Sequence, residues 1–380
     1  MDLKYRKFGR VDFNASVLGF GCMRFPVFDN DPAKIDQDEV NRMIHYAIDH
    51  GVNYFDSAYV YHAGKSEEAL GKALKGGYRE KVKITSKMPT WMVKERADYM
   101  RFLDESIKRL DTDYIDMYLI HSLDKERLAL MEKTDGFSAI DEYKKSGKAK
   151  SVGFSFHDDL ETFKRIVDRY DWDFCQIQLN YMDDHYQAGV EGLEYAASKG
   201  LAVIVMEPLR GGKLAKTPAA PVQKVWDQAD VKRSPVEWAL RWVWNHPQVT
   251  LLLSGMSTFE QVVDNVRLAD EAEASSLTEK ELALIAEAKK TYGSLAKVNC
   301  TACEYCMPCP FGVNIPGNFT FYNEAFIYDD LEGRKEDYNR WMEPESRADK
   351  CRQCGKCEKL CPQKIEIRKR LKEVAATFAE

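Results

Sequence analysis

Short apolar runs alternate with amphipathic stretches through the first 290 residues of the chain. The runs are only a few residues long and rich in valine, isoleucine, leucine and phenylalanine, which predicts buried strands rather than helices. The predicted strands cover residues 16–20, 52–55, 82–85, 115–120, 151–154, 174–179, 202–205 and 249–253. Helical periodicity lies between them, over residues 39–48, 65–74, 100–110, 137–145, 160–169, 189–199 and 235–245. This part of the chain therefore alternates strand and helix.

Eight such units within roughly 250 residues predict an α/β fold, a (β/α)8 TIM barrel, over residues 1–290. A doubly wound sheet is the alternative, but the chain shows no glycine-rich dinucleotide fingerprint. In a TIM barrel the chemistry takes place at the carboxyl ends of the strands. Polar residues just beyond those ends are therefore the candidates for function.

Charge and targeting signals narrow the class of protein. The formal net charge is −6, which gives no basic surface for nucleic acid or an anionic membrane. The first ten residues lack the apolar stretch of a signal peptide, and no segment approaches the ~20 apolar residues of a membrane span. We expect a cytoplasmic protein with a small-molecule substrate and with neither nucleic acid nor membrane as a partner.

The cysteines are unevenly distributed. Cys22 and Cys175 are isolated, whereas the other eight of the ten lie between residues 300 and 361. In a reducing cytoplasm, clustered cysteines indicate metal ligands rather than disulfides. Residues 291–380 are accordingly predicted to form a second, smaller metal-binding domain.

The clustered cysteines form two runs that each end in Cys-Pro. The first contains Cys300, Cys303, Cys306 and Cys309, and the second contains Cys351, Cys354, Cys357 and Cys361. The second has the C-x2-C-x2-C-x3-C-P spacing of bacterial ferredoxins, in which the fourth cysteine binds the other cluster. This rule predicts two [4Fe–4S] clusters, one on Cys351, Cys354, Cys357 and Cys309, the other on Cys300, Cys303, Cys306 and Cys361.

Zinc is the alternative occupant of these cysteines, because paired C-x2-C segments also make four-thiolate zinc sites. Three cysteines at successive intervals of three, occurring twice, favour clusters. The first run departs from the ferredoxin pattern, since only Met307 and Pro308 precede its fourth cysteine. A helix is expected near residues 319–328 and a polar stretch over 334–340. The tail thus resembles helix-rich dicluster ferredoxin modules.

Four polar residues stand near consecutive strand ends in the predicted barrel. Asp56 and Tyr61 follow the second strand, Lys87 follows the third, and His121 ends the fourth. The segments around them, residues 54–61, 85–87 and 118–121, resemble the Asp-Tyr-Lys-His tetrad motifs of the aldo-keto reductases. Residues 5–9 and 18–21 resemble that family's N-terminal signature. With its tail, the chain is similar to the subgroup that carries a fused dicluster ferredoxin domain.

The resemblance implies an oxidoreductase that reduces a carbonyl group or oxidises an alcohol. Tyr61 would be the general acid, with a phenol pKa of ~10 lowered by the Lys87 ammonium. Asp56 would hold the lysine, and His121 would orient the substrate carbonyl. The alternatives are that Tyr59 takes the place of Tyr61, that Asp56 and Lys87 form a structural ion pair, and that His121 is a core histidine.

The implied nicotinamide site follows the family less closely. Ser155 and Gln176 match the family residues, but Phe156 stands in place of an asparagine and Met206 in place of a stacking aromatic residue. The other implied nucleotide-binding residues are Pro208, Leu209 and Gly211 after the seventh strand, and Ser254, Gly255 and Asn265 around the eighth. Met256 and Gln261 stand where basic residues usually hold a 2′-phosphate, so NAD(P)H is the expected cofactor, with NADH favoured over NADPH.

Several functional alternatives remain open from the sequence. The two substitutions around the nicotinamide allow a flavin in its place, which would couple hydride transfer to single electrons on the clusters. A reductase driven by flavin or clusters, acting on a substrate other than a carbonyl, is one alternative. Another is a barrel whose clusters are purely structural or serve for docking. Trp91, Met88 and Phe156 predict an apolar mouth, and a ferredoxin-like protein is the expected electron partner.

Overall fold

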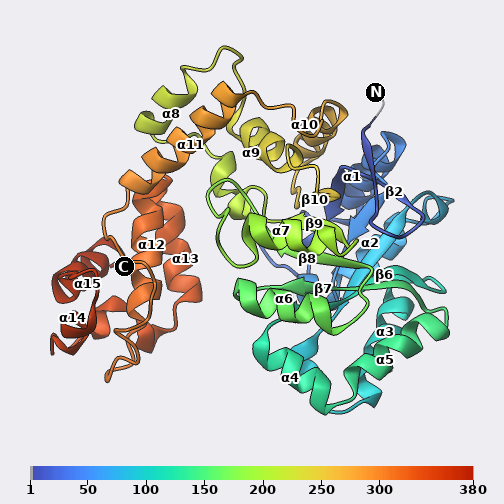
Figure 1. The fold of residues 1–380 in the computed structure, drawn as a ribbon, viewed down its shortest axis with the longest axis horizontal. Coiled ribbons are helices and arrows are strands. Elements are labelled where there is room, and N and C mark those ends of the chain that lie inside the picture. The colour runs from blue at the N-terminus through green and yellow to red at the C-terminus, as the bar shows by residue number, and fades with distance from the viewer. Residues whose placement is uncertain (1–2, 380) are drawn as a thin grey trace. The chain divides into compact units, whose positions relative to one another are not determined.

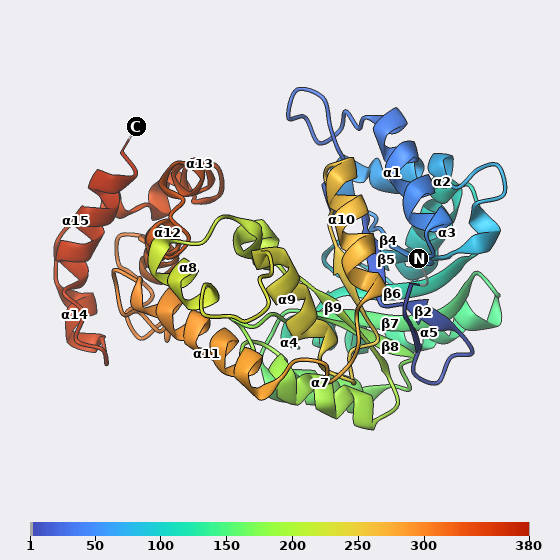
Figure 2. The same ribbon diagram turned by 90° about the horizontal axis from the view of Figure 1, so that it is seen from above.

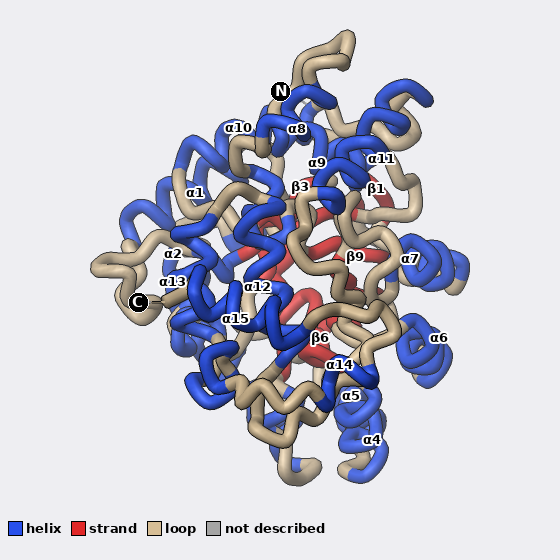
Figure 3. The backbone as a smooth tube through the Cα atoms, turned by 90° about the vertical axis from the view of Figure 1, so that its left-hand side faces the viewer, coloured by secondary structure: helices blue, strands red, loops and turns tan. Residues whose placement is uncertain are grey.

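In the computed structural model, which describes residues 3–379, parallel strands close into a barrel. The order around the barrel is β10, β3, β4, β5, β6, β7, β8 and β9, so every strand neighbours the next one in sequence. Helices surround the strands (Figures 1 and 3). The barrel strands are β3 (Leu18–Gly21), β4 (Tyr54–Asp56), β5 (Lys83–Met88), β6 (Ile115–Leu123), β7 (Ala149–Phe156), β8 (Phe174–Gln178), β9 (Ala202–Met206) and β10 (Leu251–Ser254). The TIM barrel predicted from the apolar pattern is confirmed.

The helices of the barrel follow the predicted periodicity closely. They are α1 (Gln37–Asp49), α2 (Ser66–Ala73), α3 (Ala97–Leu110), α4 (Lys125–Lys133), α5 (Gly136–Lys145), α6 (Leu160–Arg169), α7 (Gly189–Ser198), α9 (Pro235–Trp244) and α10 (Phe259–Asp270). Aspartate or threonine side chains accept a backbone N–H at the start of several of them, namely Asp36, Asp124, Asp159 and Thr258. Such caps satisfy donors that the first turn of a helix leaves unpaired. The ranges given as examples of helical periodicity do not include α4 and α10, although eight strand–helix units imply a helix after the last strand.

An antiparallel hairpin that the sequence analysis did not predict precedes the barrel. It pairs β1 (Tyr5–Lys7) with β2 (Asn14–Ser16). Phe8, at the turn, is fully buried, and its ring centre lies 5.9 Å from that of Tyr54 and 5.6 Å from that of Phe174. These three belong to one apolar cluster with barrel side chains such as Leu119 and Ile204. The hairpin therefore contributes to the hydrophobic core of the barrel.

The chain divides into two compact units. One contains the residues up to Gly211 and Val236–Leu277, and the other contains Gly212–Pro235 and the residues from Thr278 onward. The second unit comprises α8 (Ala220–Trp226), α11 (Glu279–Ser294), α12 (Ile315–Ile327), α13 (Leu331–Trp341), α14 (Lys356–Leu360) and α15 (Ile367–Thr377). Within it α8 lies beside α11 (Figure 2). The expected domain boundary between residues 290 and 291 falls within α11 and stays a prediction.

The second unit has its own apolar core. Phe319 and Tyr322 of α12 and Leu371 and Val374 of α15 belong to this core, and six of the clustered cysteines pack against it. The stretch expected to be polar forms α13, in which Tyr338 is the one buried residue. Among the described residues, no helix is both long and apolar enough to cross a membrane.

Candidate functional site

The four candidate catalytic residues lie at the carboxyl ends of three adjacent strands. Asp56 ends β4, Lys87 is next to last in β5, and His121 lies in β6. Tyr61 begins the 3₁₀ turn that follows β4. Because β4 pairs with β5 and β5 with β6, the barrel brings these residues from distant parts of the chain to one place. Asp56 and Lys87 are buried, with exposures of 3% and 1%.

Lys87 connects the members of this group. Its ammonium forms an ion pair with Asp56 and donates a hydrogen bond to the Ser57 carbonyl at 2.7 Å. Its Nζ also lies 4.7 Å from the centre of the Tyr61 ring. The Tyr61 and His121 rings meet edge to face, with their centres 6.0 Å apart. All four side chains thus form one connected cluster.

Burial and charge act in opposite directions within the cluster. Burial raises the pKa of Tyr61 above its ordinary value, while the Lys87 ammonium opposes that rise. Burial lowers the pKa of Lys87, but Asp56 and Tyr61 outweigh it and raise that pKa. The lysine is therefore cationic, and the phenol keeps its proton at neutral pH. The family resemblance implied a lowered phenol pKa, but burial of the phenol outweighs the effect of Lys87 and raises it.

His121 is held as a neutral imidazole. Burial, followed by the charge of Lys87, lowers its pKa well below the usual range. The centre of the Trp91 ring lies 5.1 Å from that of His121, and the Thr90 hydroxyl donates to the His121 carbonyl at 2.6 Å. Trp91 is 46% exposed, whereas Met88 and Phe156 are fully buried. Of the three residues expected at an apolar mouth, only Trp91 is accessible.

The loop that carries Tyr61 is fixed from both sides. Arg109 of α3 donates to the Tyr59 carbonyl at 3.0 Å and pairs with the buried Glu67 of α2. Tyr59 directs its own hydroxyl to Glu105, at 2.5 Å. On the other side, the His62 ring accepts the Phe25 N–H at 3.1 Å. Tyr61, not Tyr59, therefore lies beside Lys87.

Ser155 and Gln176 lie side by side in the barrel, since β7 pairs with β8 at these two positions. Both are buried, and the Ser155 hydroxyl accepts the Ser122 N–H at 2.7 Å. The Gln176 amide is close enough to Asp56 to oppose the rise in its pKa that burial causes. Phe156 instead packs on Phe163, with ring centres 5.0 Å apart. The barrel thus brings Ser155 and Gln176, but not Phe156, toward the tetrad.

The remaining nucleotide candidates lie after β9 and β10. Met206 ends β9 and is partly buried, and the loop that contains Pro208, Leu209 and Gly211 follows it. Backbone φ angles are positive at Glu207, Arg210 and Gly211, which gives this loop its tight path. Ser254 ends β10, Gly255 follows it, and the buried Asn265 of α10 donates to the Ser254 hydroxyl at 3.0 Å.

The structure adds two residues that the sequence analysis missed. Arg24, just after β3, donates to the Gly211 carbonyl at 3.4 Å, and its side chain lies against Gly255. It supplies a cation between the two candidate nucleotide loops. Cys22, directly after β3, is buried and close enough to Asp56 and Lys87 for both charges to affect its pKa, which burial raises. The rule of inspecting residues beyond strand ends, applied to the first barrel strand, would have found both.

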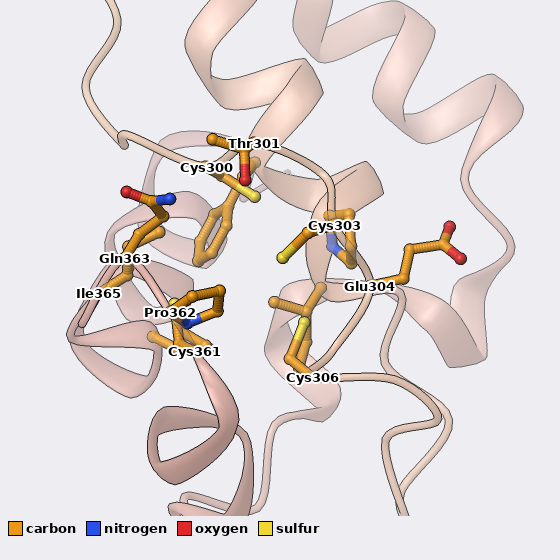
Figure 4. A pocket seen from close by; sticks show the side chains of 13 residues that line it. Cys300, Thr301, Cys303, Glu304, Cys306, Cys361, Pro362, Gln363 and Ile365 are labelled. Carbon is orange, nitrogen blue, oxygen red and sulfur yellow. The ribbon is translucent and has the colours of Figure 1, made fainter. Parts of the chain in front are cut away.

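The eight clustered cysteines line two neighbouring cavities in the second unit. Around the first lie Cys300, Cys303, Cys306 and Cys361, and around the second lie Cys309, Cys351, Cys354 and Cys357. Figure 4 shows the Cys300, Cys303 and Cys306 side chains pointing toward one another. Cys306 also reaches the second cavity. The fourth cysteine of each run thus lies with the first three cysteines of the other run.

The two cysteine loops share one backbone conformation. In the first loop φ is positive at Ala302 and Glu304, and in the second it is positive at Gln353 and Gly355. Each pair occupies the same places, namely two residues after the first cysteine and directly after the second. Positive φ is uncommon for residues other than glycine, and strain of this kind is concentrated at functional sites. The repeated conformation indicates that both loops are shaped for the same kind of ligand.

Asparagines of α12 hold the chain just before each loop. Val298 lies two residues before Cys300. The Asn323 side chain accepts the Val298 N–H at 2.8 Å and donates to the Val298 carbonyl at 2.7 Å. Asn318 donates to the Ser346 carbonyl at 2.8 Å and accepts the Tyr338 hydroxyl at 2.6 Å. That hydroxyl in turn accepts the Ala348 N–H, three residues before Cys351. One helix therefore positions both cysteine loops.

The described cysteines are not gathered around the position of a single metal ion. Zinc draws four thiolates to within about 2.3 Å of one point. Among residues 3–379, no group of three or more His, Cys, Asp or Glu side chains is arranged to hold one metal ion. The cavity volumes are about 20 Å³ and about 230 Å³. The second cavity is therefore the larger of the two, and each proposed ligand set consists of four thiolates, which are the ligands of a [4Fe–4S] cluster.

Comparison with known proteins assigns a family to each part of the chain. The aldo/keto reductase family model matches residues 17–290, and the 4Fe-4S dicluster domain model matches residues 299–366. L-galactose dehydrogenase from Arabidopsis thaliana is 26% identical over 302 residues, which cover 74% of this chain and 92% of that protein. A probable aldo-keto reductase 1 from Glycine max is 37% identical over 157 residues, 39% of this chain and 44% of the soybean protein.

Solved structures show the same barrel. The holo form of aldo-keto reductase AKR11C1 from Bacillus halodurans superposes with a TM-score of 0.63 at 25% identity, covering 75% of this chain and 96% of that one. A putative aldo-keto reductase from Pseudomonas aeruginosa gives a TM-score of 0.56 at the same identity, covering 70% and 94%. The chain belongs to the aldo-keto reductase family and is an oxidoreductase with a 4Fe-4S dicluster domain.

Proposed function

We propose that this protein reduces a carbonyl group, or oxidises the corresponding alcohol, at the mouth of its barrel while two [4Fe–4S] clusters relay electrons. The observation that carries the proposal is the connected cluster of Asp56, Lys87, Tyr61 and His121 at adjacent strand ends. The substrate is a small molecule. NADH that is not used for a carbonyl would be oxidised to NAD⁺ with release of a proton, its two electrons going one to each cluster. From the clusters the electrons would pass singly to a ferredoxin-like protein. Clustered cysteines that act as ligands also favour the reducing cytoplasm as its location.

Carbonyl reduction requires a hydride at carbon and a proton at oxygen. Tyr61, whose pKa burial raises, carries that proton at neutral pH and donates it to the developing alkoxide. Lys87 stabilises the phenolate that remains, and the ion pair with Asp56 holds the ammonium in place. His121, as a neutral imidazole, donates a hydrogen bond to the substrate oxygen and orients it.

A nicotinamide bound beside Asp56, Tyr61, Lys87 and His121 would supply the hydride. Ser155 and Gln176 fit its carboxamide, since both are buried and the Gln176 Oε1 has no hydrogen-bond partner. Met206 would lie against the nicotinamide ring. Pro208, Leu209 and Gly211 would hold the pyrophosphate, with Arg24 as the nearby cation. Ser254, Gly255 and Asn265 would hold the adenosine. Met256 is uncharged, so the position of a usual 2′-phosphate contact offers no cation, which favours NADH.

The cysteine arrangement supports two clusters with crossed ligands. Cys300, Cys303, Cys306 and Cys361 would hold one cluster, and Cys309, Cys351, Cys354 and Cys357 the other. Clusters bound there would each exchange one electron at a time. The protein's part is to hold the thiolates, exclude competing ligands and keep the two sites adjacent through Cys306, which borders both cavities.

Tyr61→Phe tests the catalytic part of this proposal. Removing the phenol hydroxyl deletes the proton donor but keeps the ring, so we expect kcat for NADH-dependent reduction of an aldehyde or ketone to fall by about 10²–10⁴. Steady-state assays with a panel of such carbonyl compounds on cluster-reconstituted protein measure it.

Tyr59→Phe is the matched control. It also removes a phenol hydroxyl from this loop, but that hydroxyl donates to Glu105 and does not lie beside Lys87. It should leave kcat within a few-fold of the wild type. Equal turnover by the Tyr61→Phe variant and the wild type would refute the assignment of Tyr61 as the acid.

A further inference from the structure

The two cysteine cavities are matched in most features that set the reduction potential of a cluster. These features include hydrogen bonds to the sulfurs, solvent exposure and nearby charge. In the first loop the backbone nitrogen of Ala302 lies 3.4 Å from the Cys300 sulfur. In the second loop the side-chain nitrogen of Gln353 lies 3.4 Å from the Cys351 sulfur. Each loop also has one exposed cysteine, Cys303 or Cys354.

Charge is the feature in which the cavities differ. Of the described residues that line the first cavity, Glu304 is the one with a charged side chain. The second cavity is lined by three basic side chains, Arg352, Lys356 and Arg368, and by no acidic one among the described residues.

One acidic group near the second cavity offsets part of this charge. Glu358, next to Cys357, pairs with Arg368 at 2.8 Å. Arg368 is nevertheless close enough to Cys354 and Cys357 to interact electrostatically with both thiolates. Arg352 and Lys356 remain as further positive charges on the rim. The side chains that line the second cavity therefore stay net positive even when Glu358 is counted, and the one charged side chain that lines the first cavity is negative.

We infer that a cluster in the second cavity has the higher reduction potential of the two and holds the electron when the pair is half-reduced. A cluster held by four thiolates is anionic, and reduction adds one more negative charge. Positive side chains nearby favour the reduced form, and a carboxylate disfavours it. The inference rests on the proposed cluster sites and gives the relay a direction, from the first cavity to the second.

Solvent makes the effect moderate and dependent on salt. Arg352, Lys356 and Glu304 are exposed, so water and ions screen their interaction with a cluster. The difference between the two potentials should therefore narrow as ionic strength rises. A difference caused by hydrogen bonds or by cluster geometry would not respond in this way.

A redox titration of the full-length, reconstituted protein tests the inference. Dithionite is added stepwise under anaerobic conditions, and reduced clusters are counted by electron paramagnetic resonance. We expect two midpoint potentials. Arg352→Gln combined with Lys356→Gln should lower the higher midpoint and leave the lower one in place. Glu304→Gln should raise the lower midpoint. Lys359→Gln is the control, because this exposed lysine of α14 does not line the cavity.

Two results would overturn the inference. One is a shift of the lower midpoint, instead of the higher, in the Arg352 and Lys356 variant. The other is a higher midpoint potential that is the same in this variant as in the wild type. Failure of the cluster sites themselves would be seen separately, because iron analysis of the wild type would then give fewer than about eight irons per chain.

Discussion

The tetrad and the cysteine cavities obtain their functional side chains in different ways. The tetrad draws one residue from each of β4, β5 and β6 and one from the turn after β4, so it exists only when the barrel is closed. Each cavity takes three of its cysteines from a single short loop and only the fourth from elsewhere. The tetrad therefore depends on the whole barrel. The cysteine cavities depend on the local backbone conformation of two loops, each of which contributes one cysteine to the cavity of the other.

The crossed exchange of cysteines gives the largest expected effect. Cys300→Ser combined with Cys309→Ser removes a ligand from each cavity, so the iron content should fall from about eight atoms to near zero. Cys300→Ser combined with Cys361→Ser removes two ligands of the same cavity, so about four irons should remain. Iron and acid-labile sulfide analysis of reconstituted protein measures both.

The two double variants act as each other's control. Each removes two cysteines, so a general loss of stability would affect both alike. If each cluster were instead held by one continuous run, the two iron contents would be exchanged, and the crossed arrangement would be wrong.

The next largest effect is on the stability of the barrel, on which the tetrad depends. Phe8 is fully buried against Tyr54 and Phe174, so Phe8→Ala should lower the free energy of unfolding of the barrel by about 3–5 kcal/mol. Urea denaturation followed by tryptophan fluorescence measures mainly the barrel, which contains five of the seven tryptophans, and cluster absorbance follows the tail. The midpoint for the tail should stay unchanged.

Phe28→Ala is the control for this variant, because Phe28 is 55% exposed and its loss should change stability by less than about 0.5 kcal/mol. An equal shift of the fluorescence and cluster midpoints in Phe8→Ala would show that barrel and tail unfold as one cooperative unit. The contrast between a site made by the whole barrel and one made locally would then fail.

The smallest expected effect is on pH dependence. Alcohol oxidation needs Tyr61 as a phenolate that accepts the proton. Since burial raises the pKa of Tyr61 and Lys87 opposes that rise, Lys87→Met should raise the pKa further. The oxidation rate should then increase with pH as in the wild type, but along a curve displaced to higher pH. At fixed pH the rate falls about tenfold for each unit of displacement.

Rates of alcohol oxidation between pH 6 and 10 measure this displacement. Lys81→Met is the control, because Lys81 is exposed and pairs with Asp49, away from the tetrad. An unchanged profile in Lys87→Met would mean that the lysine does not act on the Tyr61 proton.

The sequence predicted the barrel well because its strands are short, continuous apolar runs. Each predicted strand overlaps an observed one, and most predicted helices match within a few residues. The hairpin of β1 and β2 was missed because β1 is largely exposed and neither strand contains a continuous apolar run. The α13 helix was missed because only Tyr338 is buried there, so no apolar periodicity marks it.

The two sites also contain features that the sequence predicted and features that it did not. Cysteine spacing is local, so it predicted which cysteines lie together, including the exchange of Cys309 and Cys361. The positive φ of Ala302 and Gln353 carries no sequence signal, because neither is a glycine. Arg24 follows the end of β3, so the strand-end rule could have singled it out as a candidate. Its contacts with Gly211 and Gly255 could not be predicted, because they depend on closure of the barrel, which brings β3 beside β10. Burial of the tetrad, which decides the direction of the Tyr61 pKa shift, is also a property of the closed fold.

An anaerobic titration of the reconstituted protein with NADH, recorded across the visible spectrum, tests the central claim that barrel and tail form one electron path. NADH gives up two electrons and one proton, and the two clusters together can accept both electrons. The account predicts that NADH bleaches the cluster absorption, and the starting spectrum would reveal a flavin if one takes part. Carbonyl reduction that proceeds with no bleaching would contradict the account and leave the clusters structural.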